Sequence, residues 1–497
     1  MTTTDARRVG AVIVGTGFAG LGMAIRLRQA GIDDFVLLER AGDVGGTWRD
    51  NTYPGCTCDV PSSLYSFSFA PKADWTCTYP SQAEIWTYLR ECAETFGVMP
   101  HIHFNSGLED AAWDEPSSTW RVRSQRGDFI TRFLILGVGP LSDPKLPSIP
   151  GLERFTGPAF HSAQWRHDHD LSGERVAVVG TGASAIQFVP KIQPQVSRLD
   201  LYQRTPAWVL PHPNRNLTSA EHWLARALPF TQKVRRASIY MGREMFVLGF
   251  AVNPRFMTVA ERMGRAHLKA QVADAGLRAA LTPNYRIGCK RILISNDYYP
   301  ALTQANVNVI TTGIREVRER SIVAADGRER AVDAIIFGTG FRVTDPPVAH
   351  VVRGSAGASL ADAWQGSPQA YLGTSVAGFP NMFFLTGPNT GLGHTSLVFM
   401  IESQIQYVLD CLRTMHRQGA TVVDVKPEAQ AEFNGAVQQR MKTTVWTTGG
   451  CASWYFDANG RNTTLWPTFT FAFRRRTARF EPSAYTLTAA APRRAAA

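Results

Sequence analysis

The segments that decide the fold read AVIVGTGFAG over residues 11–20 and VAVVGTGASA over residues 176–185. In each, four apolar residues precede a Gly-x-Gly turn, and a helical pattern follows. A dinucleotide fingerprint needs this strand–turn–helix order, because the glycines permit a tight turn and the helix N-terminus offers free N–H groups to a pyrophosphate. The two segments therefore predict an α/β chain with two Rossmann-like dinucleotide-binding domains.

The residue that ends the strand after each turn carries the opposite charge in the two segments. Glu39 lies nineteen residues after Gly20, and Arg204 lies nineteen residues after Ala185. A glutamate accepts hydrogen bonds from ribose hydroxyls and repels a 2′-phosphate, whereas an arginine can pair with that phosphate. The first domain is therefore expected to bind FAD or NAD and the second NADP, which predicts a flavoprotein that takes hydride from NADPH.

Length and charge narrow the class of protein. A chain of 497 residues is too long for one core, so two or three domains are expected. The formal net charge is +11, but the basic residues are dispersed apart from Arg474–Arg476 and no nucleic-acid motif is present. The positive balance indicates attraction of a polyanionic cofactor such as NADPH or an ordinary solvated surface. No nucleic-acid partner is expected.

The cysteines and the N-terminus point to the cytoplasm. Seven cysteines with irregular spacing predict free thiols in a reducing compartment rather than a disulfide framework. Cys56 and Cys58 form the only close pair, and no second pair completes a zinc site, so no metal is expected. Arg7 and Arg8 lead straight into the first strand without a signal peptide, and no apolar run approaches the ~20 residues of a membrane span.

The order of the segments predicts that the second domain interrupts the first. Residues 9–150 are expected to form the first part of the FAD-binding domain, and residues 346–485 its second part. Residues 151–345 would form the NADP-binding domain, with a helical insertion at about 217–282, where no strand signal occurs. Residues 486–497 are expected to be a disordered tail.

Two glycine-containing segments are expected to carry the chain between the domains. Residues 137–139 (GVG) and 338–341 (GTGF) each follow an apolar strand; the alternative is two unrelated βα turns. A helix is expected over residues 81–96, and a hairpin at Arg126-Gly127. The prolines of residues 140–150 predict a linker.

Beyond the two turns, the segment FTGPAFHSAQW over residues 155–165 resembles the fingerprint of Baeyer–Villiger monooxygenases, which belong to the wider flavin-containing monooxygenase group. Phe155, Gly157, His161 and Trp165 match the fingerprint in order. Trp165 stands where the heteroatom-oxidising relatives tend to have Tyr or Phe. The last fingerprint position is usually Pro or Asp, and here it is Arg166. The resemblance implies that His161 links the domains and transmits movement; a packed turn is the alternative.

Two further blocks carry the same resemblance. Residues 45–48 (GGTW), followed by residues 53–55 (YPG) and Asp59, resemble the flavin loop of the family. Residues 288–291 (GCKR), followed by residues 297–299 (DYY), resemble the segment that supplies the active-site arginine and a lysine for NADP. Trp48 could instead be a core residue, and Asp59 a helix or turn cap. Lys290 and Arg291 could be a solvated basic pair.

The turns and the resemblance together give the expected site. The expected cofactor-binding residues are Gly15, Gly17, Phe18, Gly20, Glu39, Thr47, Trp48, Asp59, Tyr65, Leu108, Gly180, Thr181, Gly182, Ala183, Ser184, Arg204, Thr205 and Lys290. The expected catalytic residues are Arg291 and Asp59. Arg291 would be the fixed cation where negative charge develops, and Asp59 would orient it.

The resemblance implies that this chain uses FAD and NADPH to insert one oxygen atom from O2 beside a ketone carbonyl, through a flavin C4a-peroxide, to give an ester or lactone. Its partners would be O2 and a small ketone, or a sulfide. A flavin monooxygenase that oxidises sulfur or nitrogen is the nearest alternative. A disulfide reductase is disfavoured because Trp48 stands where a redox cysteine would lie. A non-catalytic nucleotide-sensing flavoprotein would leave Arg291 and Asp59 unexplained.

A glycine pair near the C-terminus has two interpretations. Gly449-Gly450 lies between Trp446 and Trp454 in the segment VWTTGGCASWYF. It would form a mobile lid or pocket wall that excludes water, or a structural aromatic turn.

Overall fold

The first fingerprint builds the centre of the larger sheet of the computed structural model, which describes residues 6–489. The sheet has the order β17-β4-β5-β6-β1-β2-β3, and β18 also pairs with β6. Pairing is parallel except along β4-β5-β6, where it is antiparallel. The strands are β1 (Arg7–Val14), β2 (Phe35–Leu38), β3 (Ile102–His103), β4 (Leu108–Asp114), β5 (Thr119–Ser124), β6 (Gly127–Leu136), β17 (Val352–Arg353) and β18 (Met382–Phe384).

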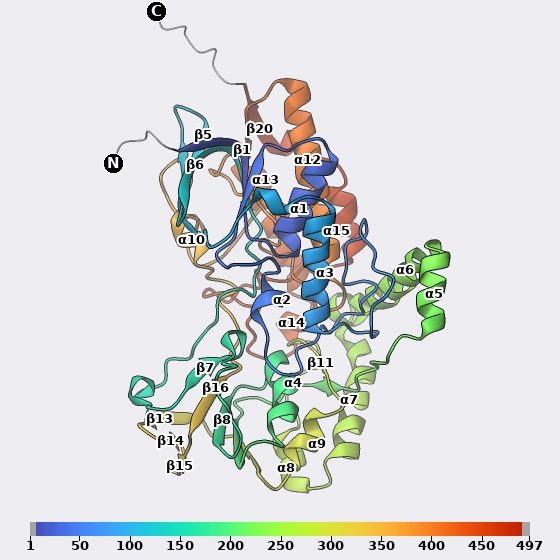
Figure 1. Ribbon diagram of the computed structural model, residues 1–497, viewed down its shortest axis with the longest axis vertical. Coiled ribbons are helices and arrows are strands. Elements are labelled where there is room, and N and C mark those ends of the chain that lie inside the picture. The colour runs from blue at the N-terminus through green and yellow to red at the C-terminus, as the bar shows by residue number, and fades with distance from the viewer. Residues whose placement is uncertain (1–5, 490–497) are drawn as a thin grey trace, which may run out of the picture.

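The second fingerprint builds the smaller, wholly parallel sheet, whose order is β12-β9-β8-β16-β7. Its strands are β7 (Ala159–His161), β8 (Arg175–Val179), β9 (Arg198–Tyr202), β12 (Val307–Ile310) and β16 (Ala334–Phe337). In both sheets the fingerprint turn leads into a helix, α1 (Phe18–Gln29) and α4 (Ala183–Ile192). Figure 1 shows the two sheets as separate lobes, the larger one above. The predicted pair of Rossmann-like domains is confirmed.

The NADP-binding domain is inserted in the FAD-binding domain. The chain leaves the larger sheet after β6 and returns to it at β17 and β18, after β16. The two crossing segments lie side by side: Lys145 N donates to Gly340 O at 2.8 Å, and Arg342 N donates to Asp143 O at 2.9 Å. The expected crossings at residues 137–139 and 338–341 are therefore confirmed, and they are not unrelated turns.

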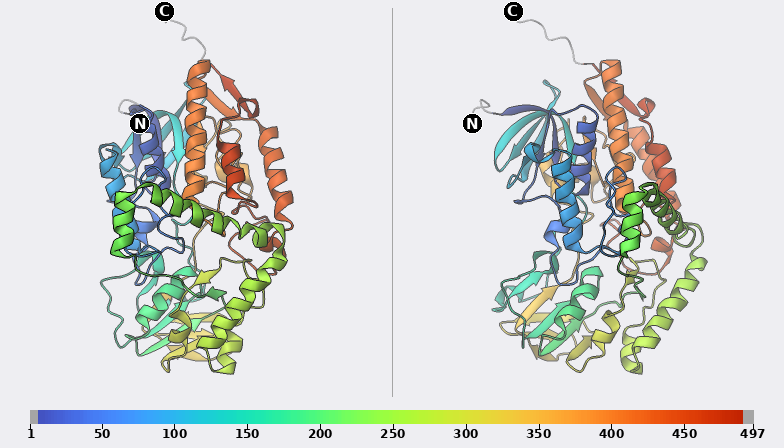
Figure 2. Two further views of the ribbon diagram at one scale, coloured as in Figure 1. Left: turned by 90° about the vertical axis from the view of Figure 1, so that its right-hand side faces the viewer. Right: turned by 45° about the vertical axis from the view of Figure 1, so that its right-hand side comes forward.

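The helical insertion forms an arm along one side of both lobes (Figure 2). As expected, no strand occurs between residues 217 and 282, a segment that the structure describes in full. The arm consists of α5 (Ser219–Ala227), α6 (Phe230–Glu244), η4 (Leu248–Val252), η5 (Pro254–Phe256), α7 (Met257–Gln271) and α8 (Ala275–Ala280).

The remaining elements connect and cover the sheets. They are α2 (Thr47–Asp50), α3 (Gln82–Thr95), η1 (Met99–His101), η2 (Leu152–Arg154), η3 (Ser162–Gln164), β10 (Val209–Leu210), β11 (Leu293–Ile294), α9 (Tyr298–Leu302), β13 (Ile314–Arg318), β14 (Ser321–Ala324), β15 (Glu329–Ala331), α10 (Val348–Val351), α11 (Leu360–Trp364), α12 (Leu397–Gln418), β19 (Val422–Val425), α13 (Pro427–Met441), α14 (Val445–Thr448), α15 (Thr470–Thr477), η6 (Pro482–Ala484) and β20 (Tyr485–Thr488).

Local expectations about helix and turn hold in the FAD-binding domain. Ser81 caps α3 by accepting a hydrogen bond from Glu84 N, which confirms the helix expected over residues 81–96. The β5–β6 hairpin pairs Ser124 with Gly127 and confirms the turn at Arg126-Gly127.

One expectation about the C-terminus is wrong. Residues 486–488 are not disordered, because they belong to β20, which pairs antiparallel with β19 from Tyr485 to Thr488. Residues 490–497 of the expected tail lie outside the described residues. None of the helices within residues 6–489 has both the length and the apolar composition of a membrane span.

The glycine-to-backbone contact inside the first turn generates a stability prediction. A Cβ on Gly20 would lie 1.8 Å from Gly15 O, whereas a Cβ on Gly242, also in a helix, would meet no atom within 4 Å. Gly20→Ala is expected to lower the free energy of unfolding by about 3 kcal/mol or more, and Gly242→Ala to raise it by up to about 1 kcal/mol. Thermal unfolding checks both; equal midpoints for the two variants would contradict the close approach.

Candidate active site

Both fingerprint turns leave helix N–H groups free for a ligand. Gly17 and Gly182 are the N-caps of α1 and α4, and neither supplies a capping side chain. Gly15 and Gly180 have φ angles of +96° and +109°, and a Cβ on either would lie within 2.7 Å of the carbonyl oxygen of a neighbouring strand end. Only glycine allows this approach. The two turns therefore fit pyrophosphate groups, because uncapped helix N-termini bind anions.

Glu39 is fixed at the carboxyl edge of the larger sheet. Its side chain is buried and accepts hydrogen bonds from Thr16 N (3.1 Å), Thr16 Oγ1 (2.6 Å) and Ala41 N (2.9 Å). Arg49 Nη1 lies 2.8 Å from Glu39 Oε1, the oxygen that also accepts from Ala41 N. These contacts occupy about four acceptor positions, so a ribose hydroxyl would replace one of them. Arg49 lies in α2 with its side chain 10% exposed, and it was not predicted because nothing in the sequence distinguishes it from a surface arginine.

An aromatic group lies beside the first turn. The Trp48 ring N–H donates to Tyr65 Oη at 3.1 Å, and the rings meet edge to face at 5.4 Å. The ring centroids of Phe18 and Tyr65 are 5.2 Å apart, and Thr47 Oγ1 donates to Leu141 O at 3.3 Å. The structure thus brings Phe18, Trp48 and Tyr65 together.

Leu108 lies apart from this aromatic group. It begins β4 and packs against the cluster that contains Val12 and Val14, whereas Phe18 and Trp48 belong to the cluster of Ala11 and Ile13. Successive residues of β1 point to opposite faces of the sheet. Leu108 and the aromatic group are therefore on opposite faces.

Asp59 and Arg291 form a two-pronged ion pair between the domains. Arg291 donates from Nε and Nη2 to the two carboxylate oxygens at 2.6 and 2.7 Å, and from Nη1 to Leu392 O at 3.2 Å. The Asp59 and Arg291 side chains are 27% and 31% exposed. Burial opposes ionisation of Asp59, but the charge and hydrogen bonds of Arg291 outweigh burial and lower its pKa. The Asp59 charge raises the pKa of Arg291, so the guanidinium stays protonated.

The helical insertion adds a second arginine to this pair. From the last turn of α6, Arg243 donates to Asp59 O (3.3 Å), Tyr79 Oη (3.2 Å) and His394 O (3.4 Å). The next residue, Glu244, is buried and binds three donors of the FAD-binding domain: Thr470 N (2.9 Å), Thr470 Oγ1 (2.6 Å) and His394 Nε2 (3.1 Å). Neither residue was predicted, because Arg-Glu on an amphipathic helix is typical of a solvated face.

Tyr455 is another residue near the ion pair that sequence reasoning missed. Its side chain is buried, and burial raises the pKa of its hydroxyl to about 12, against the charge of Arg291. Within residues 6–489, no group forms a hydrogen bond with the Tyr455 hydroxyl. A buried hydroxyl without a partner is costly, so this group is available to a ligand.

The NADP-binding domain gathers two cations at the edge of β9. Arg204 is exposed, and Lys290 is half-buried with Nζ 5.0 Å from the centroid of the Tyr285 ring. Burial and the charge of Arg204 both lower the pKa of Lys290, so the two cations are close. Thr181 Oγ1 donates to Thr205 O at 3.0 Å and joins the turn to the strand end. This arrangement fits a 2′-phosphate.

The fingerprint residues lie at the junction of the domains. His161 is buried, contacts Phe341 of the second crossing at 5.4 Å, and accepts a hydrogen bond from Ala163 N at Nδ1. Burial lowers its pKa to about 4, so the ring is neutral. Trp165 packs on Phe188 of α4 at 5.4 Å. Both contacts fit a linking role better than contact with a cofactor.

The remaining fingerprint residues contact neighbouring parts of the smaller domain or lie at its surface. Phe155 packs on the smaller sheet, and a Cβ on Gly157 would lie 2.2 Å from Asp333 O. Arg166, the position that departs from the family pattern, forms a 2.6 Å ion pair with Asp168 at the surface. The departure therefore leaves the junction itself unchanged.

The expectation of free thiols holds for five cysteines and is wrong for the other two. Cys289 and Cys451 form a disulfide across a sequence separation of 162, while Cys56, Cys58, Cys77, Cys92 and Cys411 are free thiols. The disulfide ties the segment of Lys290 and Arg291 to the glycine pair, and a Cβ on Gly449 would lie 2.7 Å from Cys289 Cβ. Trp446 is buried and stacks on Phe250 at 5.7 Å, whereas Trp454 is 44% exposed. The segment that contains the glycine pair is therefore anchored to the Lys290–Arg291 segment by a covalent bond.

Comparisons with known proteins agree with this geometry. Residues 12–220 match the family model "Pyridine nucleotide-disulphide oxidoreductase". A Baeyer–Villiger monooxygenase of Streptomyces coelicolor is 53% identical over 97% of this chain and 93% of its own length. One of Pseudomonas aeruginosa is 51% identical over 98% and 93%.

Solved structures show the same similarity. A cyclohexanone monooxygenase from Rhodococcus sp. Phi1 bound to NADP+ has a TM-score of 0.87 and 26% identity over 98% of this chain and all of its own. The OTEMO complex with FAD and NADP has a TM-score of 0.88 and 26% identity over 97% and 100%. With two relatives above half identity over nearly its whole length, the chain belongs to the Baeyer–Villiger monooxygenases.

Proposed function

We propose that Arg291, held by Asp59, is the cation that stabilises negative charge during oxygen insertion into a small ketone by this FAD- and NADPH-dependent monooxygenase. The observation that carries the proposal is the two-pronged ion pair between the domains. The product would be an ester or a lactone. No observation favours oxidation of sulfur or nitrogen instead.

The cofactor assignments follow from the two turns. When bound, FAD supplies the oxygen chemistry and NADPH supplies the hydride. The residues that would hold FAD are Gly15, Gly17, Phe18, Gly20, Glu39, Thr47, Trp48 and Tyr65. Those that would hold NADPH are Gly180, Thr181, Gly182, Ala183, Ser184, Arg204, Thr205 and Lys290. Leu108 has weaker support, because it lies on the other face of the sheet from the aromatic group.

Arg291 keeps donors free for the reacting atoms. A guanidinium has five N–H groups, and three of them bind Asp59 and Leu392. Two N–H groups therefore remain for an oxygen that becomes anionic. Asp59 acts as a positioning residue: it fixes the plane of the guanidinium and keeps it charged. A cation that is already oriented costs no reorganisation when charge develops.

The surroundings of the pair support an apolar ketone. Trp446 and Tyr455 belong to one buried cluster, and Leu392 supplies its backbone carbonyl to Arg291. We propose that the free Tyr455 hydroxyl orients the substrate. Similar structures include a steroid monooxygenase bound to NADP and a cyclohexanone monooxygenase bound to ε-caprolactone, which suits a cyclic or apolar ketone as the substrate class.

The domain limits and the location complete the proposal. We propose residues 9–150 and 346–485 as the FAD-binding domain and residues 151–345 as the NADP-binding domain. We propose a cytoplasmic location from the five free thiols; the Cys289–Cys451 disulfide is unusual in that compartment.

Replacement of Arg291 tests its role. Arg291→Ala is expected to retain flavin reduction by NADPH but to form ester about 10²–10³-fold more slowly, because a preorganised donor is lost. Stopped-flow absorbance measures reduction, and mass spectrometry measures product from a panel of ketones and one thioether. Arg166→Ala, which removes a surface arginine, is the matched control. Normal ester yield from Arg291→Ala would remove this residue from the mechanism.

Coenzyme choice tests the two cations at β9. Arg204→Ala is expected to raise the KM for NADPH about tenfold or more and to leave the KM for NADH nearly unchanged, because only NADPH has the 2′-phosphate. Lys290→Ala should act in the same direction. Steady-state oxidation of both coenzymes makes the measurement. Equal losses with NADPH and NADH would show that these residues do not bind the 2′-phosphate.

Thiol counting tests the disulfide. The unfolded enzyme is expected to react with five equivalents of a thiol reagent before reduction and with seven after it. Cys451→Ser should lower the free energy of unfolding by about 2–4 kcal/mol, and its melting temperature should no longer respond to reductant. Seven reactive thiols in the enzyme purified without reductant would contradict the bond.

A further inference from the structure

The helical insertion carries most of the exposed apolar surface of the protein. Fifteen large apolar side chains are exposed within residues 6–489, and twelve of them lie between Trp223 and Met263. Scattered single apolar residues are normal on a surface, whereas a contiguous group marks an interaction site.

The exposed residues follow one face of each long helix of the insertion. On α6, Phe230, Val234, Met241 and Met245 are 56–61% exposed, at spacings of four, seven and four residues. On α7, Val259 and Met263 are 66% and 49% exposed, at a spacing of four. Such spacings place the side chains in one stripe along each helix.

The inner face of α6 is already occupied. Tyr240 stacks on Phe399 at 4.8 Å, Arg236 donates to Ser63 O and Ser66 O, and Arg243 binds the active-site loops. The left view of Figure 2 shows α6 crossing the front of the molecule and α7 descending from its end. The stripes therefore lie on the outer side of the arm, and within the described residues no element covers them.

Charge accompanies this apolar surface. Residues 223–263 contain seven basic residues and two acidic ones. Of the two acids, Glu244 is buried, and Glu261 is 18% exposed and lies 3.5 Å from Arg286. The basic residues that are exposed are Arg226, Lys233, Arg255 and Arg262. Arg226 lies 3.7 Å from Asp74. The exposed side chains of residues 223–263, here called the apolar–cationic face, are thus mainly apolar or basic.

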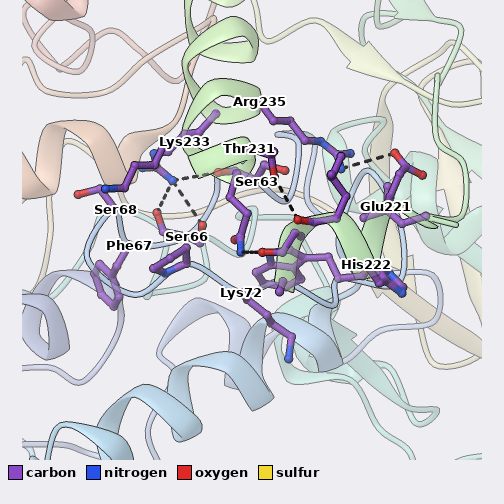
Figure 3. Close-up of a pocket in the computed structure, with 18 of the residues that line it drawn as sticks. Ser63, Ser66, Phe67, Ser68, Lys72, Glu221, His222, Thr231, Lys233 and Arg235 are labelled. Atoms are coloured by element: carbon purple, nitrogen blue, oxygen red, sulfur yellow. Dashed lines mark hydrogen bonds and ion pairs between the residues drawn. The ribbon is translucent and has the colours of Figure 1, made fainter. Parts of the chain in front are cut away.

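A cationic pocket lies beside α6 (Figure 3). Its volume is about 280 Å³, and it lies between the start of α6 and the loop of residues 63–75. Arg215 and Arg235 are paired with Glu221, and Lys72 with Asp74. Lys233, which precedes Val234 of the stripe, has no ion pair among the residues that the structure describes. The pocket places a free cation next to the apolar stripe.

We propose that the apolar–cationic face binds the surface of a membrane that contains anionic phospholipids. Amphipathic helices with basic residues bind in the plane of such a surface, where apolar side chains enter the acyl boundary and cations meet the phosphates. A second copy of this chain fits less well, because a two-fold interface would place the same exposed basic residues, Arg226, Lys233, Arg255 and Arg262, against each other.

The position of the face has a consequence for substrate entry. Met245 and Phe246 follow directly after Arg243 and Glu244, which contact the active-site loops. A ketone dissolved in the bilayer would therefore reach the enzyme next to the proposed site. Substrate entry by this route rests on the proposed function, whereas membrane binding does not.

Vesicle sedimentation with the full-length, FAD-loaded enzyme tests the proposal. The enzyme is expected to sediment with vesicles of phosphatidylcholine and phosphatidylglycerol, to bind pure phosphatidylcholine vesicles more weakly, and to lose affinity as salt rises. The double variant Phe230→Glu/Val259→Glu should bind the mixed vesicles at least about tenfold more weakly, because two apolar anchors are replaced by negative charges that the anionic lipid repels. The control Leu146→Glu changes a 53% exposed apolar residue outside the face and should bind like the wild type.

Each other outcome overturns the proposal. Wild-type enzyme that stays in the supernatant with mixed vesicles does so, as does a double variant that binds normally. Size-exclusion chromatography with light scattering measures the oligomeric state. A dimeric wild type and a monomeric double variant would assign the face to self-association. If the double variant does not fold, Lys233→Glu/Arg262→Glu replaces it and should abolish the preference for phosphatidylglycerol. Binding is measured without turnover, so a failed ketone assay leaves this test intact.

Discussion

The ion pair between Asp59 and Arg291 is the interaction on which the site depends. Asp59 comes from the loop after the flavin fingerprint, and Arg291 from the chain just before β11 of the other lobe. Each charge is partly withdrawn from water, so either one alone would be costly to bury. The pair therefore couples the approach of the domains to the formation of the site. Arg243, Leu392 and the Cys289–Cys451 bond hold the same two loops from other sides.

Insertion of one domain in the other makes this coupling possible. The two crossings run side by side, and His161 and Phe341 pack where they reach the smaller sheet. The chain thus passes between the lobes twice at one narrow junction.

Sequence reasoning succeeded where chemistry is local. The two glycine turns begin α1 and α4 as expected, because the backbone geometry of the turn dictates its sequence. The roles of Glu39, Arg204 and the three resembling blocks stay predictions. Sequence reasoning failed for contacts between distant segments: the disulfide joins residues 162 apart, and Glu244 meets Thr470 across 226 residues. β20 shows the same limit, because the pairing partner of a strand depends on the whole sheet.

The two sides of α6 explain why the insertion is the part of the chain that sequence reasoning describes least well. A helix with apolar residues on its outer side and Tyr240, Arg236 and Arg243 on its inner side reverses the usual amphipathic pattern. The polar inner side binds backbone carbonyls and active-site loops, so it cannot turn outward without leaving those groups unpaired. The apolar side is thereby fixed in the solvent-facing position. Such an arrangement is stable only because the polar contacts of the inner side outweigh the cost of exposing apolar side chains to water. The exposed apolar side chains form a surface that a lipid membrane can cover.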